Sequence, residues 1–182
     1  MTDKLQKTKL DQKLASLIHY IIWKCQDNPS KLGATKLNKI LWHSDTTAFR
    51  DLGEPITTTE YKKLQNGPVP EFQFLKTAEE FLENKNDIVS YNNELDCGYI
   101  QKQFIAKTKP DISGFKPEQI SIIDEIIYRI TAQTAKIASD ETHQNFWWDS
   151  LKLGDEIPHR SVFAKKAEIT LDDVIWAEAQ KQ

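Results

Sequence analysis

The sequence predicts a single α+β domain that is mostly helical, with a small antiparallel β-hairpin inserted between the helices. Three observations lead to this fold class. Apolar residues recur at helical spacing over most of the 182 residues. A β-type stretch interrupts them near the middle of the chain. No repeat, low-complexity tract or Gly/Ser-rich linker divides the chain, and its length suits one domain spanning 1–182.

The N-terminal part predicts three helices and a corner. Helical periodicity covers residues 10–27, and Pro29 ends this first helix. Gly53 stands where the C-terminal cap of the second helix needs a positive φ. A Thr-rich arm and a further helical turn ending in Tyr61 lead to a Gly-Pro-x-Pro corner, and Pro70 is the predicted first residue of the third helix. The second helix carries an inward face of Leu37, Ile40, Leu41, Ser44 and Ala48, and the third carries one of Phe74, Ala78, Phe81 and Leu82.

The middle of the chain predicts a hairpin and then a long helix. Residues 88–91 and 99–107 read as two strands joined through Asn92–Asn93. Pro117 opens the next helix, whose apolar stripe extends to Ile137. Because this stripe is so long, we expect the helix to be the longest of the chain. Because the helix is also apolar on two sides, we expect it to be the central one.

The C-terminal part predicts two shorter helices. The polar cluster 139–142 is expected to cap a helix that carries Phe146, Trp147 and Leu151 and ends at Gly154. An extended exit, 156–159, leads to a helical tail over 161–182. That tail contains a final short helix starting at Thr170.

Composition favours a soluble cytoplasmic protein. Lys and Arg number 24 against 27 Asp and Glu, for a net charge of -3, and this balance disfavours nucleic-acid binding. No secretory signal is visible, and the longest apolar run, 17–23, is too short to cross a membrane. Cys25 and Cys97 lie far apart without CxxC spacing, which fits a reducing compartment. Cys25 is expected to be a small buried residue.

The templates for catalysis and cofactor binding find no match in the sequence. The four histidines form no HxxxH or HExxH pair, and His43 and Asp45 point to different helix faces, so we expect no metal site. GxSxG, GxGxxG and GxxxxGK[ST] are absent. We therefore expect no cofactor and no enzyme activity. Two readings stay open for the consecutive Trp147 and Trp148: one ring is exposed for a partner, or the C-terminal tail covers it.

The stretch from Thr35 to Pro70 is the most specific part of the chain, because many unlike constraints follow one another there. Its helix reads Lys36-Leu37-Asn38-Lys39-Ile40-Leu41, and the block continues with Trp42, Asp45, Gly53, Ile56, Thr57, Tyr61 and Gly67-Pro68-Val69. Thr142-His143, Trp147 and Ile157-Pro158 follow later in the chain. In the order of these parts the sequence resembles the Panacea domain, the SocA-like antitoxin family, over a core of about 36–158.

This resemblance implies an antitoxin of a bacterial or phage toxin–antitoxin pair. Such a protein would neutralise a cognate toxin by binding it directly, with an ATP-dependent protease as a further partner if it acts as a proteolytic adaptor. The resemblance and the aromatic content together nominate candidate partner-binding residues. They are Trp42, His43, Asp45, Ile56, Thr57, Tyr61, His143 and Trp148.

Two other interpretations of these residues stay open. A small cytosolic enzyme could use His43, Asp45, Tyr61 and His143 in one cleft, since histidine suits acid–base chemistry. Alternatively, Tyr61 and His143 form hydrogen bonds inside the core and only hold the fold.

Overall fold

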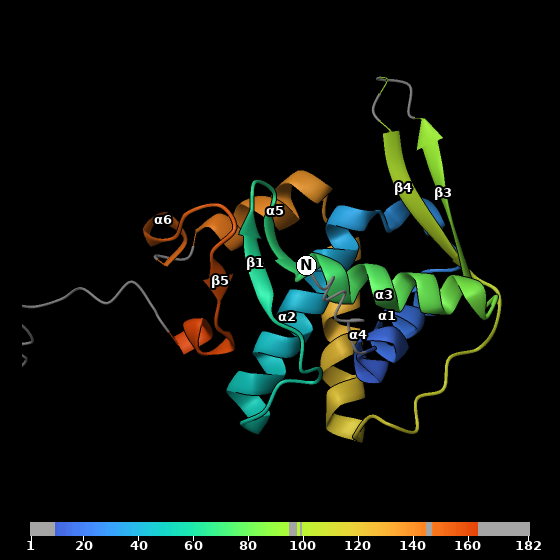
Figure 1. Cartoon of the computed structure of the whole chain (residues 1–182), viewed down its shortest axis with the longest axis horizontal. Helices are drawn as coiled ribbons and strands as arrows, with labels where there is room; N and C mark the ends of the chain where they lie inside the picture. The colour runs from blue at the N-terminus through green and yellow to red at the C-terminus, as the bar shows by residue number, and fades with distance from the viewer. Residues whose placement is uncertain (1–9, 95–97, 99, 145–146, 164–182) are drawn as a thin grey trace, which may run out of the picture.

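Helix α2, Ala34–Leu52, lies at the centre of the protein (Figure 1). It contacts α1 (Gln12–Lys24), α4 (Pro117–Thr131) and α5 (Ala135–His143), as well as strands and the C-terminal turn described below. The computed structural model describes residues 10–94, 98, 100–144 and 147–163. The mixed helical and stranded architecture confirms the predicted α+β class.

The predicted boundaries of the first helices are largely confirmed. Asp11 caps α1 by accepting from the Leu14 amide, and Pro29 starts a short 3-10 turn, Pro29–Lys31, after the helix has ended. Gly53 caps α2 with φ of 81°, as its position in the sequence predicts. The predicted inward residues of α2 are all buried: Leu37, Ile40, Leu41, Ser44 and Ala48.

The expectation that the helix beginning at Pro117 is the longest and the central one is wrong. α4 has 15 residues and α2 has 19. The apolar stripe stops early because the Thr134 side chain accepts from the Ile137 amide and caps a new helix, α5. Ile137 is half exposed rather than part of the core stripe.

Residues 61–70 form a β-hairpin, which corrects the predicted helical turn ending in Tyr61. β1 (Tyr61–Leu64) pairs with β2 (Gly67–Pro70), and Tyr61 lies opposite Pro70. The two prolines of β2 are tolerated because β2 is an edge strand, in the sheet order β2-β1-β5. Consequently Pro70 ends a strand, and α3 (Phe72–Asn84) starts two residues later than predicted. Its predicted inward residues Ala78 and Leu82 are buried, and Phe74 and Phe81 pack against the core.

The predicted second hairpin is present and projects from the body of the protein (Figure 1). β3 (Ile88–Glu94) and β4 (Ile100–Ala106) are antiparallel, with Ile88 opposite Ala106. Asn92 and Asn93 lie within β3 instead of forming the connection, because the ladder continues as far as the pair Glu94–Ile100.

The C-terminal part differs most from the sequence-based expectation. The cluster 139–142 lies inside α5 and does not cap the next helix, and α6 (Trp147–Ser150) is short. β5 (Glu156–Ile157) adds to the outer edge of β1, with Ile157 opposite Tyr61. A 3-10 helix, η2 (His159–Phe163), then packs on α2. Phe146, Cys97, the helix predicted from Thr170 and most of the tail 161–182 lie outside the described residues.

The core consists of the inward faces of α1, α2 and α4 with contributions from the strands. Cys25 is buried there, as expected, and burial raises the pKa of its thiol to about 11. Among the described residues, no helix has both the length and the apolar character needed to cross a bilayer.

Candidate functional site

Asp45, Thr57 and Tyr61 form a buried hydrogen-bonded cluster, here called the carboxylate clasp. The Asp45 carboxylate accepts from the Thr57 amide at 2.7 Å, from the Thr57 hydroxyl at 2.6 Å and from the Tyr61 hydroxyl at 2.7 Å. Gly53 makes this possible, because its left-handed conformation turns the chain back along α2. All three side chains are at most 1% exposed. The clasp therefore ties the arm after Gly53 to the central helix.

Burial dominates the electrostatics of the clasp. It raises the pKa of Asp45 to about 6, although the hydrogen bonds from Thr57 and Tyr61 act in the opposite direction. Burial and the nearby Asp45 carboxylate hold the pKa of Tyr61 well above its usual range. The Asp45 carboxylate accepts three internal hydrogen bonds and is closed to solvent, so it is suited to stabilising the fold.

The rings of Trp42 and His159 cover the carboxylate clasp, and His159 comes from the C-terminal 3-10 helix η2. Trp42 meets the Tyr61 ring edge-on at 5.0 Å, and the His159 ring packs edge-on against Tyr61 at 5.7 Å. His159 also faces Trp42, and burial lowers its pKa, so the ring is neutral near pH 7. Ile56 is likewise buried. β5 and η2 therefore cover the side of α2 that carries Trp42.

His43 and His143 lie apart from the clasp. His43 is partly buried, and burial together with the charges of Arg129 and Lys39 lowers its pKa to about 3. His143 on α5 stacks on the Trp148 ring at 4.3 Å, and burial lowers its pKa. Asp45 and Tyr61 are sealed in the core, so the four residues of the hypothetical enzyme cleft do not meet at one surface.

The structure thus separates the nominated partner-binding residues by burial. Six of them have almost no surface to offer a partner: Trp42, Asp45, Ile56, Thr57, Tyr61 and Trp148. Trp148 is 8% exposed and lies between the His143 ring and the Lys63 ammonium, whose nitrogen is 4.4 Å from the Trp148 ring centre. Tyr61 does form a core hydrogen bond, as the structural interpretation expects, whereas His143 is held by stacking. Within the described chain, no group of three or more His, Cys, Asp or Glu side chains could hold a metal ion.

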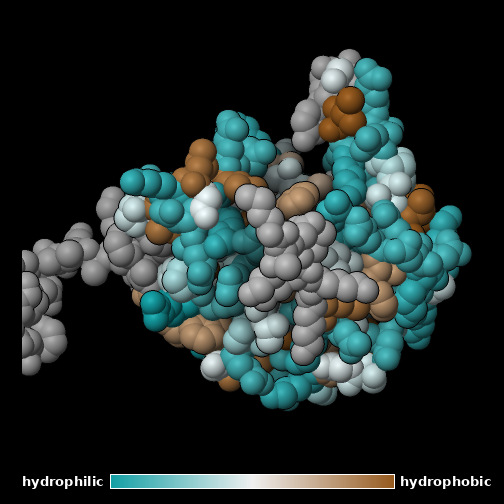
Figure 2. Space-filling view, in the orientation of Figure 1, coloured by the Kyte–Doolittle hydropathy of each residue, from teal (hydrophilic) through white to brown (hydrophobic). Residues whose placement is uncertain are grey.

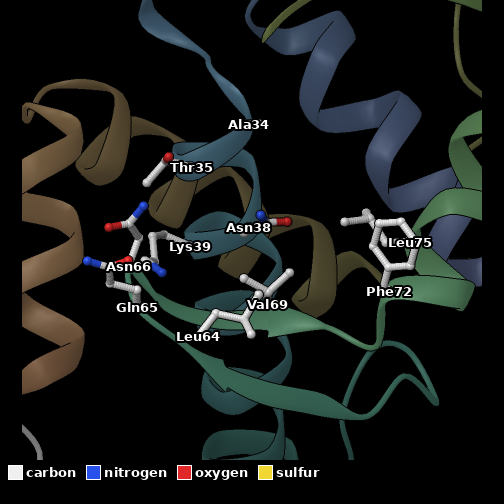
Figure 3. Close-up of a pocket in the computed structure, with 10 residues that line it drawn as sticks. All are labelled: Ala34, Thr35, Asn38, Lys39, Leu64, Gln65, Asn66, Val69, Phe72 and Leu75. Atoms are coloured by element: carbon white, nitrogen blue, oxygen red, sulfur yellow. The ribbon is translucent and has the colours of Figure 1, made fainter. Parts of the chain in front are cut away.

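The structure shows an open site that the sequence does not indicate, here called the hairpin groove. It has a volume of about 530 Å³ and lies between the first turns of α2, the β1–β2 hairpin and the start of α3 (Figure 3). One end is polar and the other is apolar, as the side chains in Figure 3 show. The residues that line it are Ala34, Thr35, Asn38, Lys39, Leu64, Gln65, Asn66, Val69, Phe72 and Leu75.

The apolar end of the groove is exposed to solvent. Phe72 is 69% exposed and Leu64 is 45% exposed. On the face seen in Figure 2, apolar residues form small patches in a mostly hydrophilic surface. Two large apolar side chains beside one hollow can anchor a partner. Leu64 directly precedes the polar turn of the hairpin, whereas Phe72 begins α3, so no single sequence pattern links the two.

The polar end of the groove contains a buried lysine. Lys39 is 1% exposed, and its ammonium donates to the Pro68 carbonyl at 3.3 Å. Burial lowers its pKa to about 7. The Ser139 hydroxyl donates to the Asn66 carbonyl, which ties the hairpin turn to α5. Gly67 allows this packing, because its φ is 106° and a side chain there would collide with Lys39 and Thr142.

Comparison with known families identifies the domain. The family model described as antitoxin SocA-like, Panacea domain, matches residues 37–149, which include most of α2, the carboxylate clasp and the β1–β2 hairpin. β5 and η2 lie beyond the matched residues. No curated protein and no solved structure matched the chain. The match covers more than half of the chain and agrees with the order of motifs in its sequence, and the chain therefore belongs to the SocA-like antitoxin family defined by the Panacea domain.

Proposed function

We propose that this protein neutralises a cognate toxin by binding it directly, and that the hairpin groove is the contact surface. The family supports an antitoxin role. The observation that carries the choice of surface is the exposure of Phe72 and Leu64 beside a hollow of about 530 Å³. Aromatic and aliphatic side chains that pack into a partner supply much of the affinity of protein interfaces.

The hairpin groove fits this role better than the nominated residues of the carboxylate clasp. A partner that touched Asp45 or Tyr61 would have to displace β5 and η2 and break hydrogen bonds of 2.7 Å. The groove needs no such rearrangement, because its apolar wall already faces solvent. The hairpin that forms this wall is fixed on two sides, by pairing with β5 and by the bond from Ser139. A rigid wall lowers the entropic cost of binding.

The test is co-expression of this protein with the product of the neighbouring gene. We expect that product to arrest growth alone and to be harmless beside the wild-type protein. Phe72→Asp should abolish protection, because it places a charge on the apolar wall. Tyr128→Asp is the matched control, since Tyr128 is an aromatic residue that is 80% exposed on α4. It should leave protection intact.

Two outcomes would contradict different parts of the proposal. A neighbouring product that is harmless alone, or that remains toxic beside this protein, refutes direct neutralisation of that product. Protection that survives Phe72→Asp, with the variant folded by circular dichroism, refutes the groove as the contact surface. Toxin levels distinguish stoichiometric binding from a proteolytic adaptor. Binding leaves the toxin at its original level in a complex, whereas an adaptor lowers it only in cells that contain the ATP-dependent protease.

A further inference from the structure

The Lys39 ammonium is a buried cation without a balancing carboxylate in the described part of the chain. Within the described part of the chain, its hydrogen bond is to the Pro68 carbonyl, at 3.3 Å. Burial is the sole cause of its lowered pKa, with no acidic side chain acting on it. A charge in this position lacks most of the solvation that water would provide. It is therefore suited to accept an anion that arrives from outside the fold.

Two other lysines near the groove are paired with acidic side chains. Lys136 pairs with Asp140 at 2.6 Å in the neighbouring hollow, and Lys62 pairs with Glu71 at 3.6 Å near the apolar end. No acidic residue is among the side chains that line the groove. Lys39 is thus the one unmatched charge among the described lining residues, and the groove is complementary to a negative group.

Lys39 has two exposed neighbours at the polar end of the groove. Lys39 lies beside Gln65 and Asn66 at the polar end of the groove (Figure 3). Both of these residues are exposed, and both lie in the turn between the paired positions Leu64 and Gly67. Their side chains can turn away while the β1–β2 ladder stays intact. A carboxylate could then approach the ammonium without unfolding the hairpin.

Two buried polar atoms near Lys39 have no hydrogen-bond partner in the structure. The Asn38 side-chain oxygen is buried and has no hydrogen-bond partner in the structure. The same is true of Nε2 of His143, which lines the neighbouring hollow. Buried polar atoms without partners are costly, and they are often satisfied when a ligand binds. A peptide offers both donors and acceptors to such groups.

A second hollow beside the polar end of the groove indicates how a bound peptide chain would continue. It has a volume of about 400 Å³ and shares Thr35 and Asn66 with the hairpin groove. The two hollows therefore adjoin at these two residues, next to the polar end of the groove. A bound segment can run on in both directions, which favours the interior of a chain over its C-terminus as the source of the carboxylate.

We propose that the hairpin groove binds an internal segment of the toxin in which an Asp or Glu lies next to an apolar residue. The acidic side chain pairs with the Lys39 ammonium, and the apolar side chain packs on Phe72 and Leu64. This inference rests on the proposed function, because it takes the toxin as the partner. It adds the chemistry of the recognised segment, which membership of an antitoxin family does not specify.

Three blocked peptides test this chemistry without the toxin. Acetyl-Leu-Glu-Leu-amide carries only a side-chain carboxylate, acetyl-Leu-Gln-Leu-amide carries none, and acetyl-Leu-Gln-Leu with a free carboxyl end carries a terminal one. Each is titrated into the full-length protein and followed by amide NMR shifts. We expect the Glu peptide to bind about tenfold or more tightly than either other peptide, the factor that a charge-assisted hydrogen bond supplies. The shifted amides should be those around the groove.

Variants then assign the preference to residues. Lys39→Met should remove the preference for the Glu peptide, whereas Lys136→Met, which removes a nearby surface charge, should keep it. Phe72→Ala should weaken the Glu and Gln peptides by the same factor. If Lys39→Met does not fold, the Lys39 side-chain NMR signal of the wild-type protein provides the test. It should shift with the Glu peptide and stay in place with the Gln peptide.

Several results would overturn the inference. They are equal binding of the Glu and Gln peptides, a preference that survives Lys39→Met, and an equal loss of preference in Lys136→Met. Tighter binding of the peptide with the free carboxyl end would reject an internal segment. None of these results depends on neutralisation. Peptides that bind as expected, together with protection that survives Phe72→Asp, would instead reject the toxin as the occupant while the site remained.

Discussion

Replacing Lys39 by methionine should stabilise the folded protein at and below neutral pH. Methionine has a similar length and apolar volume, so it can fill the same space under the β1–β2 turn. It removes a charge that is 1% exposed and has no carboxylate partner among the described residues. The free energy of unfolding should therefore rise, in contrast to most core substitutions.

The magnitude follows from the pKa of the ammonium. Burial lowers it from 10.5 to about 7 in the folded protein. Each unit corresponds to 1.36 kcal/mol, so the full penalty is about 5 kcal/mol. Below pH 7 both the folded and the unfolded chain carry the proton, and the whole penalty acts. Between pH 7 and 10.5 the unfolded chain still binds a proton that the folded protein has released, so the stability of the wild type rises with pH. Above that range the penalty has disappeared.

Urea unfolding followed by tryptophan fluorescence measures this effect. The quantity of interest is the free energy of unfolding of Lys39→Met minus that of the wild type, between pH 6 and 10.5. Titrations that both proteins share, such as those of Cys25 and Tyr20, cancel in the difference. We expect a difference of up to about 5 kcal/mol at pH 6 that falls towards zero near pH 10.5.

Lys136→Met is the matched control for this measurement. The side chain of Lys136 is 83% exposed, so its replacement should change stability little at any pH in the range. A Lys39→Met difference that is flat between pH 7 and 10.5 would refute the assignment of an uncompensated buried charge. A Lys39→Met variant that is less stable than the wild type at pH 6 would refute it as well.

Three further predictions concern the carboxylate clasp and the glycines. Tyr61→Phe removes one of the donors to Asp45 and should lower the free energy of unfolding by about 1–3 kcal/mol in urea titrations; an unchanged value would show that this bond contributes nothing. Because the pKa of Asp45 is raised from 3.8 to about 6, the folded protein keeps a proton that the unfolded chain releases, and the wild type should lose about 3 kcal/mol as pH rises from 4 to 6. Asp45→Asn should lack this slope, and the same slope in both proteins would contradict the shift. Gly67→Ala should lower the melting temperature more than Gly53→Ala, since both need a positive φ but only at Gly67 would the new methyl group collide with Lys39; equal losses would contradict the packing.

Helical periodicity and terminal signals predicted the first three helices well. The inward faces of α2 and α3 and the cap at Gly53 follow from local rules that tertiary contacts do not override. The hairpin of residues 61–70 was missed for a physical reason. Pro68 and Pro70 argue against a strand, yet the unpaired edge of β2 tolerates both. Edge position is a property of the sheet, and a single strand's sequence does not reveal it.

The identity of the central helix was missed because hydropathy measures composition and not burial. α4 is rich in isoleucine and appears central, whereas α2 buries polar side chains such as Lys39, Asp45 and Thr46. These residues lower its apolar content. The Lys39 ammonium donates to the Pro68 carbonyl and Asp45 accepts from Thr57 and Tyr61, so the partners of these two lie outside α2. The Thr46 hydroxyl donates to the Trp42 carbonyl one turn earlier in the same helix. A buried polar helix is recognisable only when its partners are known.

Missing knowledge of tertiary partners also explains why the sequence did not reveal the candidate site. The block from Thr35 to Pro70 contains three residues that meet in space, since Asp45, Thr57 and Tyr61 form one cluster. Their role in partner binding stays a prediction, and their burial favours a structural one. The hairpin groove could not be predicted, because α2, the β1–β2 turn and α3 each contribute side chains that have no common spacing.

The stability cost of Lys39 and the proposed recognition of an acidic segment are two consequences of one arrangement. A carboxylate that reaches the ammonium stabilises its charged form, so it offsets the penalty that burial imposes on the free protein. The gain on binding is then larger than that of a solvated surface pair, because the lysine has already lost its water. The fold keeps the cation in place through the Asn66–Gly67 turn, which Ser139 ties to α5. Lys39→Met should therefore have opposite effects on the two measurements, with a more stable free protein and weaker binding of the acidic peptide. A substitution that merely loosened the fold would lower both.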